Sequence, residues 1–107
     1  MSTEIKVVPC QVRLLTVIEI LSGNEVFGMR LKEIAEAVVG SGHRTTTATV
    51  LRDLQSLQAA GWAQQLDDNK WRLAAKPIQV LTNFQWGLQN ASGKLAEVQQ
   101  RYTRLSH

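Results

Sequence analysis

Apolar residues recur at the spacing of a helix face in three segments of the chain before Gly61. The first segment follows Pro9, the second runs from about Arg30 to Val39, and the third ends at Gly61. Within each segment the apolar positions lie three or four residues apart, as on the buried side of an amphipathic helix. These positions are Leu14, Val17, Ile18 and Leu21; Leu31, Ile34, Ala35 and Val38; and Val50, Leu51, Leu54 and Leu57. The pattern predicts three helices, the third capped by Thr45 or Thr46 and ended by a left-handed glycine.

Two short stretches of alternating polarity follow the third helix. Residues 62–66 and 70–73 flank the turn formers Asp67, Asp68 and Asn69, which predicts a β-hairpin. Its apolar side chains are expected to cover the helices on one face: Trp62, Leu66, Trp71 and Leu73. The apolar bridge 26–29 between the first two helices is expected to form an edge strand or to fill the core. Three helices followed by a hairpin predict a winged helix-turn-helix over residues 1–76.

A different pattern begins after Pro77. Apolar residues alternate at spacings of three and four without a break, which is the a/d pattern of a coiled coil. They are Leu81, Phe84, Leu88, Ala91, Leu95, Val98, Tyr102 and Leu105. The predicted fold class is therefore mainly α with a small β-hairpin, ending in a long amphipathic helix over residues 77–107. We expect this helix to form a homodimer, the alternative being that it packs on its own winged domain.

Composition and charge limit the range of functions that the chain can have. The chain has 107 residues, 44% hydrophobic and 20% charged, with a net charge of +3. Its basic excess lies after His43, where eight basic and four acidic residues are found. Such a distribution fits a polyanionic partner but is common in proteins that bind none.

The sequence contains no pattern typical of an enzyme, a metal site or a cofactor site. Cys10 is the single cysteine, and neither His43 nor His107 has a spaced acidic or thiol partner. The start of the chain resembles no signal peptide and no apolar run reaches the length of a membrane span, so we expect a cytoplasmic protein.

The start of the third helix, within residues 45–60, carries the residues expected to contact DNA. Threonine hydroxyls bond phosphate oxygens or base edges, a helix N-terminus favours phosphate, and arginine adds positive charge. The hairpin is expected to make at most backbone contacts, because Asp67 and Asp68 repel phosphate. The predicted DNA-binding residues are Arg44, Thr46, Thr47, Thr49, Arg52, Asn69, Lys70 and Arg72. The alternative is that these threonines serve only as caps and solvated surface, with Arg52 paired to a nearby acid.

Residues 12–73 resemble the winged helix-turn-helix domain of IclR-type transcriptional regulators. The resemblance lies in residues 13–21, 31–35 and 49–57, in Gly61 and in residues 71–73. It implies dimers that bind DNA with the third helix in the major groove. The chain departs from the family in a longer, glycine-rich linker over residues 39–45 and in having no effector-sensing domain after the hairpin. No small-molecule effector is therefore expected.

Two functions follow from these patterns. The first is sequence-specific binding of double-stranded DNA by a homodimeric transcriptional regulator, with the third helix in the major groove. The second is a winged-helix interaction or assembly adaptor that oligomerises through its last helix without binding DNA. The weak net charge and the acidic hairpin favour this second function.

Overall fold

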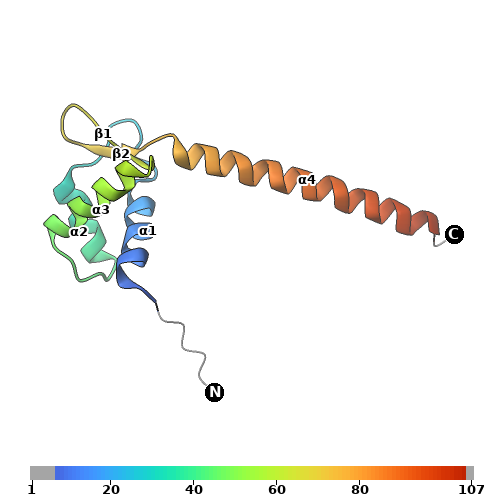
Figure 1. The fold of residues 1–107 in the computed structure, drawn as a ribbon, viewed down its shortest axis with the longest axis horizontal. Helices are drawn as coiled ribbons and strands as arrows, with labels where there is room; N and C mark the ends of the chain where they lie inside the picture. Colours follow the sequence, from blue (N-terminus) through green and yellow to red (C-terminus); the bar gives the residue numbers. More distant parts are fainter. Residues whose placement is uncertain (1–6, 106–107) are drawn as a thin grey trace, which may run out of the picture. The chain divides into compact units, whose positions relative to one another are not determined.

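Six elements follow one another in the computed structural model, which describes residues 7–105 (Figure 1). They are α1 (Pro9–Leu21), α2 (Leu31–Gly40), α3 (Thr47–Ala59), β1 (Ala63–Gln65), β2 (Trp71–Leu73) and α4 (Lys76–Leu105). The predicted class, mainly α with a small hairpin and a long last helix, is confirmed. The chain divides into two compact units that meet between Lys76 and Pro77.

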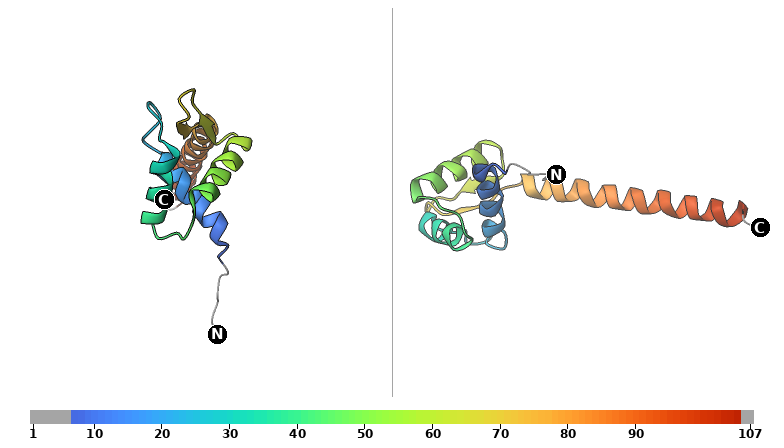
Figure 2. Two further views of the ribbon diagram at one scale, coloured as in Figure 1. Left: turned by 90° about the vertical axis from the view of Figure 1, so that its left-hand side faces the viewer. Right: turned by 90° about the horizontal axis from the view of Figure 1, so that it is seen from below.

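The core of the first unit is built by the three helices and the hairpin. Helices α1, α2 and α3 pack against one another, α3 contacts β1, and α1 contacts β2 (Figures 1 and 2). The buried apolar side chains are Val17, Leu21, Ile34, Ala35, Val38, Val50, Leu54, Leu57, Ala63 and Trp71. The other predicted helix positions are half-buried and pack against this cluster: Leu14, Ile18, Leu31 and Leu51. The helical periodicity therefore identified the buried faces correctly.

The two strands form an antiparallel pair in which Ala63 faces Leu73 and Gln65 faces Trp71. Trp71 is buried as predicted, while Trp62, Leu66 and Leu73 are half-buried. Ala63 is also buried, a position that the alternation of larger residues did not reveal. Asn69 closes the turn in the left-handed region, with φ of 65°.

Met29 joins the hairpin from the loop between α1 and α2. Its backbone N–H donates to the Trp71 carbonyl at 2.8 Å, and the Trp71 N–H donates back at 2.7 Å. Part of the expected edge strand at residues 26–29 is thus present, as a one-residue bridge. The prediction that this segment fills the core is wrong for Val26 and Phe27, which are each 78% exposed.

A bidentate ion pair connects α1 to α3. The Arg13 guanidinium donates from Nε to Asp53 Oδ2 at 2.5 Å and from Nη2 to Oδ1 at 3.0 Å. Asp53 is the one buried charged or polar residue among those that the structure describes. The hydrogen bond to Asp53 raises the pKa of Arg13, although burial acts in the opposite direction. Arg13 therefore stays positively charged throughout the ordinary pH range.

The second unit is α4, a helix of 30 residues and about 45 Å at 1.5 Å per residue. Pro77 lies in its first turn, where a missing N–H is tolerated. The a/d residues of its apolar seam (residues 81, 84, 88, 91, 95, 98, 102 and 105) are exposed wherever their side chains are described. Examples are Leu88 at 53% and Val98 at 47%. Leu105 ends the helix, and its side chain lies outside the described residues.

No helix in residues 7–105 combines the length and the apolar character that crossing a bilayer requires.

Replacing Asp53 by Ala should lower the free energy of unfolding by about 2 kcal/mol, because it leaves the half-buried Arg13 without its charged partner. Chemical denaturation followed by circular dichroism measures this change. Asp68→Ala is the matched control, since the exposed Asp68–Lys70 pair at 3.6 Å should contribute less than about 1 kcal/mol. The double substitution Arg13→Met with Asp53→Leu should recover most of the loss. Equal costs for Asp53→Ala and Asp68→Ala would contradict this role of the pair.

Gly28→Ala should destabilise the fold more than Gly61→Ala. Both glycines have positive φ, of 72° and 82°, so alanine costs about 1 kcal/mol of backbone strain at either site. Only at Gly28 would the new Cβ lie 3.0 Å from the Trp71 carbonyl oxygen and 3.1 Å from Leu66 Cδ1. Thermal unfolding of the two variants side by side tests this difference, and identical midpoints would contradict the close packing of this loop on the hairpin.

Candidate nucleic-acid interface

The first turn of α3 is fixed by its own threonines. Thr46 is the N-cap: its hydroxyl oxygen accepts from the Thr49 backbone N–H at 3.2 Å. The hydroxyls of Thr46 and Thr49 also share a hydrogen bond of 3.0 Å. Of the two predicted caps, Thr46 is therefore correct. Among the threonines predicted to bind DNA, Thr47 remains exposed with no hydrogen bond from its hydroxyl to any described residue.

The solvent-facing side of α3 is the best-defined surface of the candidate interface. One face of this helix holds Val50, Asp53, Leu54 and Leu57, all buried. The opposite face, spaced at i, i+4, i+7, i+8 and i+11, consists of exposed residues: Ala48, Arg52, Gln55, Ser56 and Ala59. Among the described residues, neither Arg52 nor Gln55 has a side-chain hydrogen bond or ion pair, so Arg52 does not form the acidic pair considered as an alternative.

Sequence reasoning missed Ala48, Gln55 and Ser56 on this face. The signal was present, because residues half a helical period from the buried leucines must point outward. The predicted contacts were threonines and arginines around the helix N-terminus, so they included Arg52 but not the exposed residues further along the helix. Gln55 matters most, since a glutamine side chain can make two hydrogen bonds to an adenine edge, as arginine does to guanine.

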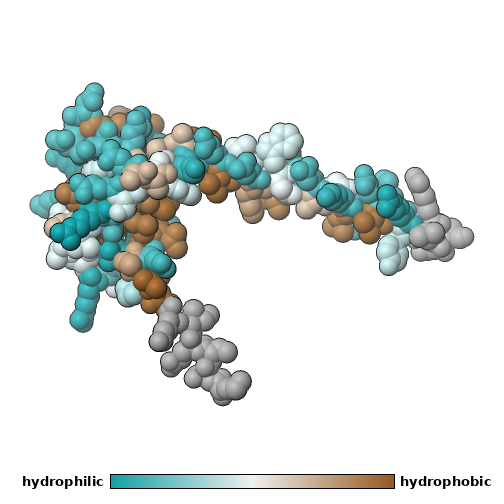
Figure 3. Space-filling view, in the orientation of Figure 1, coloured by the Kyte–Doolittle hydropathy of each residue, from teal (hydrophilic) through white to brown (hydrophobic). Residues whose placement is uncertain are grey.

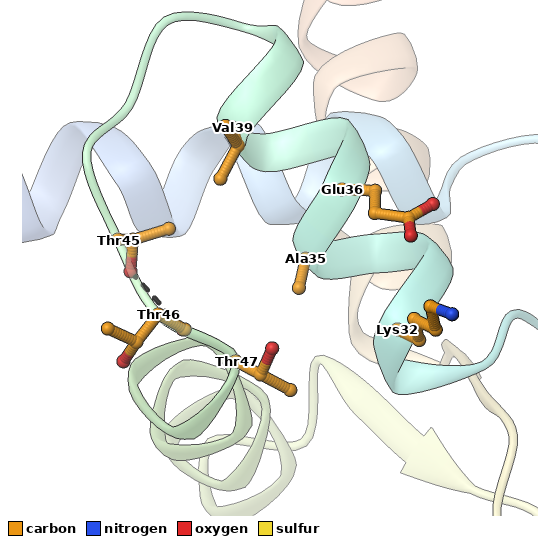
Figure 4. Close-up of a pocket in the computed structure, with 7 residues that line it drawn as sticks. All are labelled: Lys32, Ala35, Glu36, Val39, Thr45, Thr46 and Thr47. Atoms are coloured by element: carbon orange, nitrogen blue, oxygen red, sulfur yellow. Dashed lines mark hydrogen bonds between the residues drawn. The ribbon is translucent and has the colours of Figure 1, made fainter.

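A shallow groove lies between α2 and the start of α3. Its lining residues are Lys32, Ala35, Glu36, Val39, Thr45, Thr46 and Thr47. Figure 4 shows the short side chains of Ala35 and Val39 directed from α2 toward the threonine segment, whereas Glu36 extends away from it. With one cation and one anion on its wall, the groove has no net charge that favours a phosphate group.

The glycine-rich linker before α3 is tied to α1. Gly42 adopts a φ of 98°, and the next residue, His43, places Nε2 2.9 Å from the Thr16 hydroxyl. His43 was expected to lack an acidic or thiol partner, and its contact is with a hydroxyl instead. This attachment holds the chain where it enters α3 and leaves Arg44 exposed.

The hairpin offers less to DNA than its basic residues suggested. Arg72 donates from Nε to Gln64 Oε1 at 3.2 Å and from Nη1 to the Glu25 carbonyl at 3.3 Å. Lys70 lies 3.6 Å from the Asp68 carboxylate. Asn69 is exposed in the turn, beside two exposed aspartates. Arg72 and Lys70 therefore interact with groups of the same domain, and Asn69 lies beside negative charge.

The predicted DNA-binding residues thus fall into two groups. Arg44, Thr46, Thr47, Thr49 and Arg52 gather around the first two turns of α3, and Asn69, Lys70 and Arg72 lie on the hairpin. Within residues 7–105 no group of three histidine, cysteine or acidic side chains is placed to hold a metal ion. The chain matches no protein-family model, no curated protein and no solved structure. The resemblance to IclR-type regulators therefore stays a prediction based on the residues quoted above.

Thr46→Ala should lower the free energy of unfolding by about 1 kcal/mol, because it removes the N-cap of α3. Thr47→Ala, one residue further along, should leave stability nearly unchanged, since its hydroxyl makes no bond to a described residue. Urea denaturation of both variants provides the comparison. A larger loss for Thr47→Ala than for Thr46→Ala would contradict the capping geometry.

Proposed function

We propose that the chain is a small winged-helix regulator that binds double-stranded DNA in a sequence-specific manner, with α3 in the major groove. The observation that carries this proposal is the division of α3 into two faces. One face is anchored by buried leucines and by Asp53, and the other presents Arg52 and Gln55 to solvent. A rigidly held helix with unengaged arginine and glutamine side chains suits the reading of base edges.

The supporting elements around α3 fit the same role. Thr47 and Arg44 lie at its N-terminal end, where backbone N–H groups favour phosphate. The order of three helices and a hairpin is that of a winged helix, and the hairpin is proposed to make only backbone contacts. The protein is proposed to act in the cytoplasm as a homodimer through α4, without a small-molecule effector.

One observation favours the second function, an assembly adaptor. The apolar seam of α4 is exposed along its described length, and Figure 3 shows apolar residues along one edge of this helix. An exposed apolar face of this kind is typical of a protein–protein interface, whether or not the first unit binds DNA. An oligomer above the dimer in sedimentation, together with no affinity for DNA, would favour the adaptor.

Arg52→Ala and Gln55→Ala should each weaken binding to a selected duplex by about fivefold to 150-fold, because one bidentate base contact contributes about 1–3 kcal/mol. Both side chains are exposed, so the thermal midpoint should stay near that of the parent. Fluorescence anisotropy at several salt concentrations, with duplexes selected from a random pool, measures the affinity.

Arg30→Ala is the matched control for these variants. It removes one exposed cation from the same unit but leaves α3 unchanged, so sequence preference should persist. Failure of the parent chain to bind any duplex at low salt would overturn the proposal. Unchanged affinity in Arg52→Ala and Gln55→Ala would show that another surface contacts DNA.

A further inference from the structure

The residues of the α4 seam differ strongly in size along the helix. Spacings of three and four assign Leu81, Leu88, Leu95 and Tyr102 to a positions and Phe84, Ala91, Val98 and Leu105 to d positions. Exposure of the described seam side chains runs from 47% at Val98 to 72% at Tyr102 among the large ones. Which partner covers such a seam depends on how large and small residues meet across it.

A parallel pair of α4 helices would pack every seam residue against its own copy. Ala91 would then face Ala91 between two layers of paired leucines, while Phe84 would face Phe84 one heptad earlier. The helices would have to approach at one layer and separate at the next. Layers that leave space unfilled lose transfer and packing energy.

An antiparallel pair matches large residues to small ones. With the two helices fully overlapped, a positions face d positions of the other copy, so that Ala91 faces Leu95 and Leu88 faces Val98. Phe84 then faces Tyr102, a pair of aromatic rings in the second layer from each end of the seam. Layer size decreases from these aromatic layers toward the centre, and the Ala91 layers are filled by leucine.

The charges of α4 favour the same orientation. Residues 77–93 contain no charged side chain, whereas residues 94–105 contain Lys94, Arg101, Arg104 and the single acid Glu97. A parallel pair would bring two such basic halves together. An antiparallel pair sets each basic half beside an uncharged half, which reduces the repulsion between like charges. Only the two copies of Lys94, at neighbouring g positions, would meet near the centre.

We infer that the occupant of the α4 seam is a second copy of this chain in antiparallel orientation. This inference rests on the dimer of the proposed function and adds its geometry. The two first units then attach at opposite ends of a helix pair about 45 Å long.

The distance between two identical labels on the full-length chain tests the orientation without DNA. Cys10→Ser removes the native thiol. Gln79→Cys then provides a single thiol, at an outward f position, to which a spin label is attached. The expected separation is about 42 Å along the axis, from about 28 residues at 1.5 Å each, against about 20 Å for a parallel pair. Gly93→Cys is the matched control, since position 93 is the midpoint of the overlap and its label pair should be short in either orientation. A Cβ at Gly93 meets no atom within 4 Å, so the control leaves the helix undisturbed.

A long distance at position 79 with a short one at position 93 supports the inference. Short distances at both positions mean a parallel pair and overturn it, and a monomer in sedimentation overturns the second copy as occupant.

A second test mixes the parent chain with the Lys94→Glu variant and determines the share of mixed dimers, which contain one copy of each. An antiparallel pair should enrich the mixed dimer, because the lysine of the parent copy then lies beside the introduced carboxylate of the variant copy. Random mixing would count against the orientation. If the label distances hold but the chain binds no DNA, the dimer geometry stands and the DNA-binding function fails.

Discussion

Burial of one face of α3 is the constraint on which the rest of the first unit depends. Val50, Leu54 and Leu57 are buried, and the helix that carries them contacts α1, α2 and β1. Because a helix has only one buried stripe of this width, the residues on the other face are forced into solvent. The exposed face of α3 is therefore a consequence of core packing, and the side chains of this face, such as Arg52 and Gln55, contribute almost nothing to the stability of the fold.

Asp53 makes this burial specific. Apolar side chains alone allow α3 to rotate or slide by a fraction of a turn at modest cost, because hydrophobic attraction has no direction. A buried carboxylate has a single acceptable position, within reach of the Arg13 guanidinium on α1. Together with the His43–Thr16 hydrogen bond at the entry to α3, the ion pair fixes how far along its axis the helix lies. The direction in which Arg52 and Gln55 point follows from that placement.

Local patterns were sufficient to predict the helices, their buried faces and the hairpin, because these depend on residues no more than ten positions apart in the sequence. What it missed depends on contacts between distant positions. Arg13 and Asp53 are 40 residues apart, and Arg72 reaches the carbonyl of Glu25 across 47. Neither pairing leaves a pattern in the sequence, since a charged residue on a helix looks the same in the sequence whether its side chain faces solvent or a partner.

The exposure of Val26 and Phe27 has a different cause. Their apolar composition predicts burial, but the tight loop that ends at Gly28 turns both side chains outward. Ala63 is buried by the register of the hairpin, which alternation of size did not reveal.

The distribution of unengaged charge explains why the second unit matters for the proposed function. Of the predicted DNA-contacting cations, Lys70 and Arg72 are engaged within the domain, which leaves Arg44 and Arg52 on each copy. Two phosphate contacts give a salt slope of only about −1.8 and correspondingly weak electrostatic attraction, whereas the four contacts of two copies give about −3.6. Such a protein cannot rely on attraction to the DNA backbone and must gain affinity from base contacts made twice. Under the proposed function, pairing through α4 would supply the second set of contacts.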